Sequence, residues 1–396
     1  MAFTKLNYCL ACNSKRLRKV LNLGQQPLAN SYLSKLKSKE KKFTLLVNCC
    51  LDCTHLQLSI AVNPKIIYEN YDYVSGTSKT YKKYMEKFYR LAIKNNSKII
   101  KKNILDIGCN DGSQLNVFKK NKFKTFGVDP AKNLFKISSK NHKIFCDFFS
   151  NKIANKINKK FDFIITQNSF AHNPKPISFL LNAKKLMHNK TTLIIQTSQA
   201  DMCRNYEFDT VYHEHINYFN IRSMMALLKR ANLYLDNVFK DPIHGTSYIF
   251  IIKLKSNQKK IKNKLREENI LNYQSYKKWG KKCKKIVEKI KGKFKKISKN
   301  KVAIGYGAAA KANTFLNFSK IKLRLIIDDN KLKQNKFCPG SKLPIKSSDF
   351  LKYYDQDILI VPLAWNFYRE IKNKVKKLRK KNNDKFVIFY PKFKVI

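Results

Sequence analysis

Short apolar runs alternate with turns and helical segments through the middle of the chain. The runs that begin at Lys102, Lys124, Lys143 and Phe161 each end in a polar residue or a turn. Apolar runs bounded in this way predict buried strands. Because strands alternate with helices, we expect an α/β domain on a right-handed, doubly wound parallel sheet. Such sheets bind their ligands at the carboxyl ends of the strands.

The same pattern predicts elements beyond these strands. A helix is expected at about 79–95, and another at 221–230 with Asn220 as its N-cap. Two further strands should close the sheet, the second at 247–254. From about 256 to 298 the chain is rich in lysine and carries a helical apolar stripe, which predicts a linking helix or helix pair.

A second strand–turn–helix pattern opens the C-terminal part of the chain. Gly305, Gly307 and Ala310 match the dinucleotide fingerprint, and Asp328 lies at a strand end 23 residues after Gly305. Taken alone the match indicates NAD, although any nucleotide or diphosphate can use such a turn. Further strands are expected at 325–329, 357–362 and 385–390. The sequence therefore predicts a second, smaller α/β unit.

Composition limits the class of protein. The chain has 396 residues, 43% of them hydrophobic, which excludes a largely disordered chain and predicts two or three domains. No apolar run approaches the length of a membrane span, and the N-terminus lacks the apolar core of a signal peptide. We expect a cytoplasmic protein with no membrane partner.

The formal net charge of +56 suggests a nucleic-acid partner. However, only 10 of the 82 basic residues are Arg, and the Lys residues are scattered through every segment. Recognition of phosphates and bases favours Arg for its bidentate geometry. We therefore expect non-specific attraction to polyanions but no specific nucleic-acid substrate.

Four cysteines form two CxxC pairs, Cys9 with Cys12 and Cys50 with Cys53. Each pair can chelate zinc from a tight turn, and four thiolates leave the metal no open position. A structural zinc site is expected, and the alternatives are a redox pair and a degenerate site derived from an ancestral zinc ribbon. Cys49 directly precedes Cys50 but does not give the required spacing.

Acidic residues mark the ends of the central strands. Asp106 ends the first strand and precedes a turn that contains Gly108, Asn110 and Gly112. Glycines let the backbone approach a ligand, but Asn110 replaces the second glycine of GxGxxG, which weakens a dinucleotide interpretation. Asp129 ends the next strand, where a carboxylate can accept both hydroxyls of a ribose.

The third and fourth strands end in further polar groups. Asp147 can read the amino group of an adenine, and Phe148 can pack on its ring. The fourth strand ends at Asn168, and its exit loop should carry His172 to the same edge of the sheet. These four strand ends together favour a nucleotide-like ligand.

The densest group of reactive side chains is Tyr212–His215, with a phenol, two imidazoles and a carboxylate. His moves protons near neutral pH, and a neighbouring carboxylate can orient it. The stretch follows a strand expected at 192–197, so it should lie on a loop at the ligand-binding edge. A polar turn without chemistry is one alternative. A metal site at His213 and His215 is another, although no HExxH spacing accompanies them.

The strand ends resemble those of the Rossmann-like, S-adenosylmethionine-dependent methyltransferases, with 106–112 as the first motif and Asp129 as the ribose-binding acid. The order of segments is more specific. It runs from the CxxC pairs and this domain to Glu207–His215 and then to motifs at 305–318, 328–330 and 363–367. Over nearly the whole chain that order resembles the zinc-containing sugar C-methyltransferases, which act on nucleotide-linked keto-deoxyhexoses.

The resemblance implies roles for the reactive residues. His215 matches the base, and Glu214 and Tyr212 match residues that orient it and contact the sugar. His172 matches another active-site histidine. A tyrosine of the loop before residue 78 also belongs there, and Tyr73 is favoured over its neighbour Tyr71.

The resemblance also implies a cofactor site. The residues expected to bind S-adenosylmethionine are Asp106, Gly108, Cys109, Asn110, Gly112, Asp129, Pro130, Asp147, Phe148 and Asn168. Ser169 and Asn173, around His172, depart from the commonest choices in that loop, which puts the details of the substrate in doubt.

We therefore expect an S-adenosylmethionine-dependent C-methyltransferase that removes a proton next to the ketone of a nucleotide-diphosphate keto-deoxysugar and methylates the enolate carbon. The expected parts are a zinc-binding domain at 1–70, a methyltransferase domain at 71–255, linking helices at 256–300 and a Rossmann-like sugar-nucleotide domain at 301–396. A monomer is expected. The alternatives are a small-molecule O- or N-methyltransferase and a zinc-ribbon protein that binds or modifies RNA.

Overall fold

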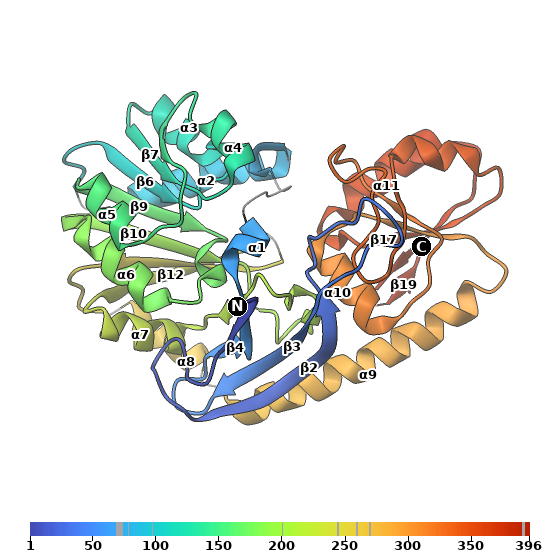
Figure 1. Cartoon of the computed structure of the whole chain (residues 1–396), viewed down its shortest axis with the longest axis horizontal. Helices are drawn as coiled ribbons and strands as arrows, with labels where there is room; N and C mark the ends of the chain where they lie inside the picture. Colours follow the sequence, from blue (N-terminus) through green and yellow to red (C-terminus); the bar gives the residue numbers. More distant parts are fainter. Residues whose placement is uncertain are drawn as a thin grey trace. The chain divides into compact units, whose positions relative to one another are not determined.

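The computed structural model describes the chain except residues 69–73, 78, 97, 200, 244, 259, 269–270 and 390–392. The chain forms two compact units (Figure 1). Unit 1 consists of Met1–Arg18, Asn48–Asp201 and Glu214–Ser275, and unit 2 of Lys19–Val47, Met202–His213 and Tyr276–Ile396. The chain therefore crosses from unit 2 back to unit 1 inside the stretch Tyr212–His215.

Unit 1 is built on a sheet in the order β12-β13-β10-β9-β6-β7-β8. The strands are β6 (Asn103–Ile107), β7 (Lys124–Val128), β8 (Lys143–Phe145), β9 (Phe161–Gln167), β10 (Met187–Thr197), β12 (Tyr234–Asp241) and β13 (Ser247–Lys253). The strands from β10 to β8 pair in parallel, as the sequence predicts. At the other edge β13 and β12 pair antiparallel, so the sheet is mixed rather than wholly parallel.

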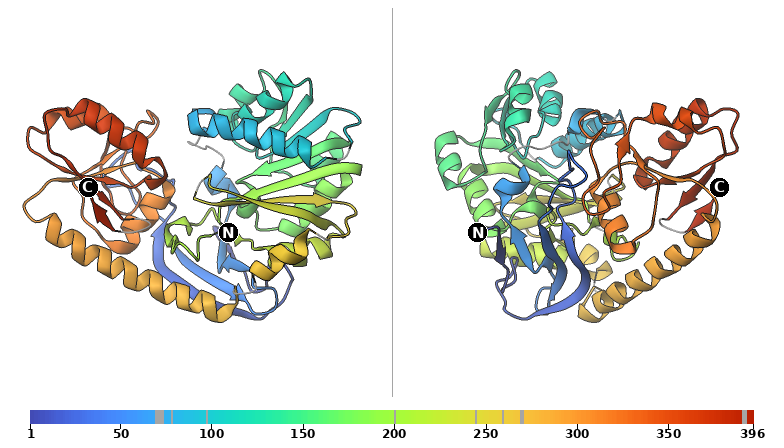
Figure 2. Two further views of the ribbon diagram at one scale, coloured as in Figure 1. Left: turned by 180° about the vertical axis from the view of Figure 1, so that it is seen from behind. Right: turned by 45° about the vertical axis from the view of Figure 1, so that its right-hand side comes forward.

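Helices cover both faces of this sheet because its central strands are apolar on both sides. α5, α6 and α7 lie over one face (Figure 1), and the reverse view shows α2 on the other (Figure 2). Successive residues of β9 alternate between the two layers: Ile164 packs with α6, whereas Phe163 and Ile165 pack with α2 and α3. The helices are α1 (Pro64–Tyr68), α2 (Lys79–Lys94), α3 (Ser113–Lys120), α4 (Lys132–Ser138), α5 (Asn151–Ile157), α6 (Pro176–Lys185), α7 (Ile221–Arg230) and α8 (Ile261–Glu267), with short 3₁₀ turns η1 (Ser75–Thr77) and η2 (Phe170–His172).

The start of α7 confirms its predicted cap. The Asn220 side chain accepts a hydrogen bond from Ser223 N at 2.8 Å, and the Ser223 hydroxyl accepts one from Asn220 N at 3.0 Å. This capping box satisfies backbone donors that the first helical turn leaves free.

The N-terminal region forms two small sheets. β1 (Phe3–Lys5) pairs antiparallel with β5 (Ile60–Val62). A four-stranded sheet has the order β11 (Asn217–Tyr218), β4 (Leu56–Leu58), β3 (Lys42–Cys50) and β2 (Leu17–Pro27). β2 and β3 carry the chain out of unit 1 and back into it.

Unit 2 contains the smaller α/β fold that the sequence predicts. Its sheet has the order β16-β15-β14-β17-β18-β19, parallel except for β19. The strands are β14 (Ala303–Tyr306), β15 (Ile326–Ile327), β16 (Ile345–Lys346), β17 (Leu359–Pro362), β18 (Lys385–Ile388) and β19 (Lys394–Val395). The helical elements are α9 (Tyr273–Ile297), α10 (Ala310–Ser319), α11 (Tyr368–Leu378), η3 (Phe208–Thr210), η4 (Ser348–Tyr353) and η5 (Trp365–Phe367). Ile304, Ile360 and Phe386 pack with Val375 of α11 in its core.

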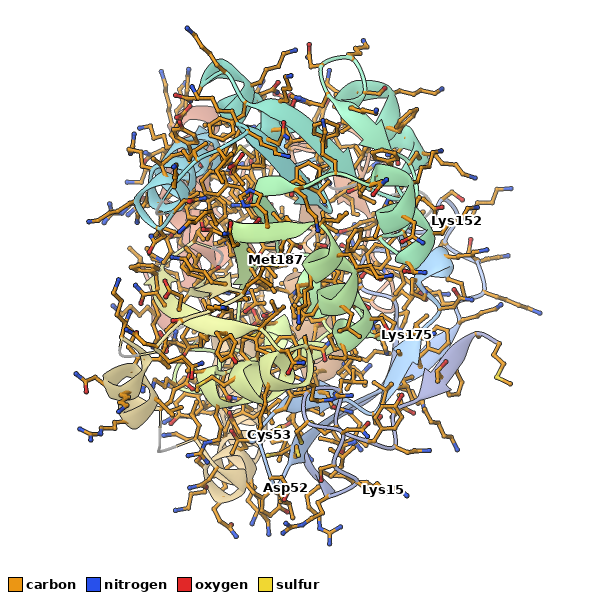
Figure 3. All side chains as sticks on the ribbon, turned by 90° about the vertical axis from the view of Figure 1, so that its left-hand side faces the viewer. Lys15, Asp52, Cys53, Lys152, Lys175 and Met187 are labelled. Atoms are coloured by element: carbon orange, nitrogen blue, oxygen red, sulfur yellow. The ribbon has the colours of Figure 1, made fainter. Side chains whose placement is uncertain are left out.

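Most of the positive charge lies on solvated surfaces. Lys15, Lys152 and Lys175 are exposed, and their side chains point outward from unit 1 (Figure 3). Among the described residues, none of the helices combines the length and apolar character needed to cross a bilayer.

Candidate active site and zinc centre

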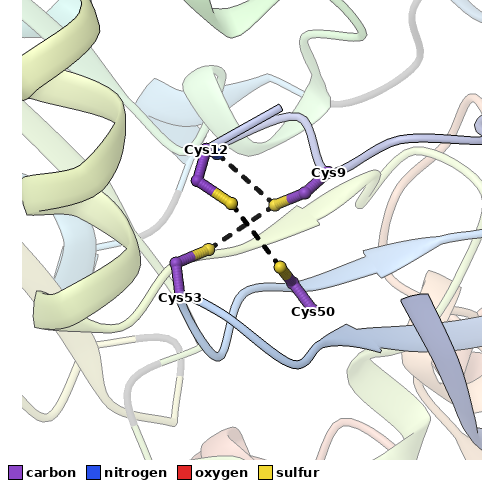
Figure 4. A group of neighbouring side chains, drawn as sticks. All are labelled: Cys9, Cys12, Cys50 and Cys53. Carbon is purple, nitrogen blue, oxygen red and sulfur yellow. Dashed lines mark hydrogen bonds between the residues drawn. The ribbon is translucent and has the colours of Figure 1, made fainter. Parts of the chain in front are cut away.

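The two CxxC turns bring four sulfur atoms together (Figure 4). All four lie within 4.8 Å of one another, and the sulfurs of Cys9 and Cys53, like those of Cys12 and Cys50, are 3.5 Å apart. A tetrahedral zinc ion with Zn–S bonds of about 2.3 Å places its sulfurs about 3.8 Å apart. The cluster therefore has the spacing of a zinc-ligand set.

Both turns share one backbone design. Asn13 N donates to Cys9 O at 2.8 Å, and Thr54 N donates to Cys50 O at 3.1 Å. The residue that follows each pair is left-handed, with φ of 70° at Asn13 and 59° at Thr54. The left-handed residue turns the chain sharply so that both thiols of a pair face the same point.

The protonation states of the four thiols suit the binding of a cation. Hydrogen bonding to Cys50 raises the pKa of the Cys9 and Cys53 thiols, whereas accepting the Cys53 thiol lowers the pKa of Cys50. A divalent cation would stabilise all four as thiolates. Cys49 is excluded from the set: its thiol donates to Cys50 O at 3.3 Å, and burial raises its pKa to about 12.

The carboxyl end of β6 carries the first cofactor motif. Asp106 is buried, and its Oδ1 has no hydrogen-bond partner in the described part of the chain. Burial, reinforced by the Asp129 and Asp111 carboxylates, raises the pKa of Asp106 well above its usual range. A positively charged ligand would relieve this clustering of acids. Gly108 has φ of +82°, and a Cβ there would lie 2.4 Å from Ser169 Oγ, so only glycine fits.

Asp129 joins that turn to the end of β7. Its Oδ2 accepts from Asn110 N at 2.8 Å and its Oδ1 from Ala131 N at 2.9 Å. Burial raises the pKa of Asp129. Because each carboxylate oxygen has two lone pairs, Asp129 can accept two ribose hydroxyls as well.

The remaining predicted cofactor contacts follow β8 and β9. Asp147 is exposed, and its Oδ1 accepts from Phe148 N at 2.7 Å. Phe148 is partly buried, whereas Phe149 packs into the core against α6. Asn168 is left-handed, with φ of 54°, and its buried Oδ1 has no partner among the described residues. An aromatic side chain and an amide therefore follow the ends of β8 and β9.

Two predicted histidines meet at this edge. His172 ends η2, directly after β9, and its ring centroid lies 5.2 Å from that of His215. The Tyr68 ring stacks on His172 at 5.7 Å, with 9° between the planes. Burial lowers the pKa of His172 to about 4, so its imidazole is neutral at neutral pH. The Tyr218 ring meets His215 edge-on at 6.4 Å.

The stretch Tyr212–His215 divides between the two units. Glu214 and His215 are buried in unit 1. His213 belongs to unit 2, where its Nε2 donates to Phe43 O at 3.2 Å and its ring packs edge-on against Phe43. Tyr212 is partly buried in unit 2. His213 therefore anchors the loop to β3, which agrees with a structural role rather than a metal-binding one.

Unit 2 holds a polar cluster around the start of α10. Lys311 Nζ lies 3.4 Å from Glu207 Oε2 and 5.1 Å from the centroid of the Trp365 ring. Trp365 Nε1 donates to Asp209 Oδ2 at 3.3 Å. The other oxygen of Asp209 is buried without a partner in the described structure. Glu207 and Asp209, which precede Tyr212, therefore face the second Rossmann-like turn.

That turn closes on Asp328 in the same way as the first cofactor turn closes on Asp129. Asp328, in the position of a ribose-binding acid, accepts from Ala308 N at 2.7 Å and Asn330 N at 2.8 Å. Lys333 Nζ donates to Ala308 O at 2.8 Å and lies 3.7 Å from Asp328. Gly307 has φ of +101°, and a Cβ there would lie 2.6 Å from the Ala364 Cβ. Asp328 is thus engaged with the turn itself.

Comparison with known proteins covers almost the whole chain. Three family models match in succession: a zinc binding domain at 9–68, a methyltransferase domain at 80–238 and a C-methyltransferase C-terminal domain at 242–391. The C-methyltransferase NovU of Streptomyces niveus is 23% identical over 409 residues, covering 99% of this chain and 97% of the relative. The chain belongs to the C-methyltransferase family.

Solved methyltransferases are similar to one part of this C-methyltransferase. An S-adenosylmethionine-dependent methyltransferase from Clostridium acetobutylicum matches with a TM-score of 0.36 and 13% identity, covering 44% of this chain and 92% of that one. Another from Archaeoglobus fulgidus matches with a TM-score of 0.34 and 13% identity, covering 43% of this chain and 94% of that one.

Zinc and S-adenosylmethionine are the cofactors of this C-methyltransferase. The four cysteine sulfurs provide the zinc site, and the acids after β6 and β7 suit a donor that carries a sulfonium and an ammonium group. Cys109 differs from the other predicted contacts, because its side chain packs into the core beside Gly127.

Two residues of η1 that contact the first cofactor motif of this C-methyltransferase, Ser75 and Gly76, were not named individually from the sequence. Ser75 N donates to Asn110 Oδ1 at 3.0 Å, and Gly76 N donates to Asp111 Oδ2 at 2.9 Å. These bonds fasten η1 to the first cofactor motif. Tyr73 and Tyr71 lie outside the described residues, although Tyr73 is only two positions before Ser75. A Ser-Gly pair after an aromatic cluster was the available signal.

Proposed function

We propose that this enzyme methylates the carbon next to the ketone of a nucleotide-diphosphate keto-deoxysugar. The observation that carries the proposal is the His172–His215 pair, with ring centroids 5.2 Å apart, at the sheet edge that suits the methyl donor. A carbon acid must lose a proton before it can attack a methyl group, so carbon methylation needs a base where many heteroatom acceptors do not.

In this proposal His215 takes the proton from the carbon, and Glu214 orients its ring. His172 is neutral because burial lowers its pKa to about 4, so an N–H of its ring can donate a hydrogen bond to the developing enolate oxygen. Tyr212 and Tyr73 contact the sugar. S-adenosylmethionine supplies an electrophilic methyl, held by the residues after β6, β7, β8 and β9. The protein's part is to place base, carbon and donor and to exclude water.

We further propose that unit 2 holds the nucleotide diphosphate of the substrate rather than NAD. The first turn of α10 carries Lys311, and Lys333 Nζ donates to Ala308 O in the loop that leads into this helix. Backbone N–H groups at a helix start and nearby ammonium groups together suit a diphosphate.

The test is incubation with a labelled methyl donor and a panel of keto-sugar nucleotides. Label on carbon supports the proposal. Label on oxygen or nitrogen, or on none of the panel, contradicts it. His215→Asn should leave donor binding intact and lower turnover roughly 10²–10⁴-fold, the usual contribution of a general base. His213→Asn is the matched control, and a full-activity His215→Asn variant would remove His215 from the role of base.

A further inference from the structure

Asn217 connects the two histidine loops. It is fully buried and lies two residues after His215. Its Nδ2 donates to Ala171 O at 3.3 Å and to Asn173 O at 2.8 Å, the backbone carbonyls on either side of His172. The Asn217 amide thus bonds to the backbone on both sides of His172. The backbone of Asn217 belongs to the segment that carries His215.

The zinc turn holds the other end of this amide. His55, two residues after Cys53, is buried, and its Nε2 lies 3.1 Å from Asn217 Oδ1. Its ring also packs on Phe219 at 4.7 Å. The zinc-binding turn and the histidine loops therefore meet at one side chain.

The chemistry of the contacts fixes the orientation of Asn217. If the amide were turned over, its oxygen would face two carbonyl oxygens, and its NH₂ would face His55. With the NH₂ donating to both carbonyls, the amide oxygen has to accept, so His55 must carry its proton on Nε2. Only this orientation satisfies both the oxygen and the NH₂ group of the Asn217 amide.

We propose that Asn217 is a positioning residue for methyl transfer, which sets His172 against His215 and is itself held by His55 of the zinc turn. This inference rests on the proposed roles of the two histidines. It gives the zinc centre a connection to the reaction that a metal held by four cysteines alone would not have.

A buried amide can also simply stabilise a fold, and Gln57 allows the two roles to be separated. Gln57 is the cross-strand partner of Asn217 in β4 and β11. It is equally buried, accepts from Leu10 N at 2.8 Å and donates to Tyr8 O at 2.9 Å. Its side-chain bonds lead to the residues on either side of the zinc ligand Cys9 rather than to the histidine loops.

The experiment compares Asn217→Ala with Gln57→Ala in the zinc-loaded full chain, after zinc content and affinity for S-adenosylhomocysteine are matched to the wild type. Asn217→Ala should lower kcat about 10–100-fold with little change in donor KM, since a displacement of about 1 Å can cost that much. Gln57→Ala should lower stability without this loss. Equal kcat losses in the two variants would overturn the proposal.

Histidine-ring NMR provides a readout that does not need a substrate. Tyr68 and His215 are the described ring groups that face His172. In Asn217→Ala the pKa of His172 should rise from about 4 towards its ordinary 6.5 as water enters the loop, and in Gln57→Ala it should not. An unchanged titration in Asn217→Ala overturns the inference, whereas failure on every keto-sugar overturns only the proposed function.

A second pair of variants applies if Asn217→Ala does not fold. His55→Gln keeps an N–H donor for Asn217 Oδ1, and His55→Met does not. The positioning role predicts kcat near wild type for His55→Gln and a loss of about tenfold or more for His55→Met at equal zinc content. Equal kcat in the two variants would contradict it.

Discussion

Asp106 combines deep burial with an oxygen that has no partner in the described chain. Its pKa is raised in the folded state, so the folded chain holds a proton that the unfolded chain releases above about pH 4. By linkage, the free chain loses stability as pH rises towards the folded pKa. The residue thus costs stability until a cationic ligand arrives.

Asp106→Asn should therefore stabilise the free chain at pH 7 and weaken the binding of S-adenosylmethionine roughly tenfold or more, the cost of losing a charged hydrogen-bond partner. Denaturant unfolding without donor and calorimetric titration with donor measure the two effects. The exposed Asp355→Asn is the control, with neither change expected. Tighter donor binding by Asp106→Asn would contradict this role.

Single residues were predictable where their chemistry is local. The CxxC cysteines, Asp106 and Asp129 could be chosen because a spacing or a strand end marks them. Gly76 and Asn217 could not, because their importance comes from partners far away in sequence, Asp111 for one and the carbonyls around His172 for the other. The Ser-Gly pair after the tyrosines marks the loop that holds Gly76, but no sequence pattern gives the partner of Gly76 or of Asn217.

At the scale of elements, η1 shows how a short turn can serve a distant motif. A Cβ on Gly76 would lie 2.6 Å from Asp111 Oδ2 and 2.3 Å from Ser113 Oγ. Gly76→Ala should push η1 off the motif and weaken donor binding about tenfold, measured as the Kd of S-adenosylhomocysteine. Gly292→Ala in α9 is the control, because a Cβ there meets nothing within 4 Å. Unchanged affinity in Gly76→Ala would exclude η1 from the cofactor site.

The loop that carries Tyr212–His215 is sensitive to acid through its anchor on β3. Burial lowers the pKa of His213 to about 4 from an ordinary 6.5. Between those values the unfolded chain binds the proton and the folded chain does not, so stability falls as pH drops from about 6.5 to about 4. A shift of that size corresponds to about 3 kcal/mol.

His213→Gln should flatten this part of the stability profile while costing about 1–2 kcal/mol at pH 7 for the altered bond to Phe43 O. Urea unfolding at pH 7.5 and pH 5 measures both terms. The profile will not become level, because burial also lowers the pKa of His172 and His142 to about 4. An unchanged slope would show that His213 does not titrate on unfolding.

The positions of helices and strands were predicted better than the directions in which the strands pair. Asn220 and α7 are confirmed because capping and amphipathic spacing are local signals. The antiparallel edge of β13 and β12 was missed, since both strand directions give the same apolar run. In unit 2, β15 is shorter than the run at 325–329, because only Ile326–Ile327 pair with neighbouring strands.

At the scale of the whole molecule, the zinc centre should behave as part of the fold. Cys50→Ala should abolish stoichiometric zinc and lower the thermal midpoint sharply, because binding energy at a four-thiolate site is folding energy. Cys49→Ala, one residue earlier and also buried, should keep one zinc per chain at a cost of about 1 kcal/mol. Native mass spectrometry and calorimetry report both quantities, and full zinc in Cys50→Ala would contradict the ligand assignment.

The linear order of motifs did not predict how the units are composed. Each unit draws on three separate segments, and that assignment depends on contacts between distant residues rather than on any local composition. The expected parts at 1–70, 71–255, 256–300 and 301–396 describe the order of motifs and remain a prediction as domain boundaries. Residues 19–47 belong with the C-terminal fold despite lying between the zinc cysteines.

This interleaving has a consequence for recombination between relatives. A chimera that exchanges only residues 276–396 would separate Asn313 from Ala29 O, which it bonds at 2.7 Å, and Lys311 from Glu207. The chain crosses between units five times, so an exchange of the whole of unit 2 requires the transfer of 19–47 and 202–213 along with the C-terminal segment. Chimeras made with a single crossover should be insoluble or inactive. Chimeras that receive all three segments should be soluble and active.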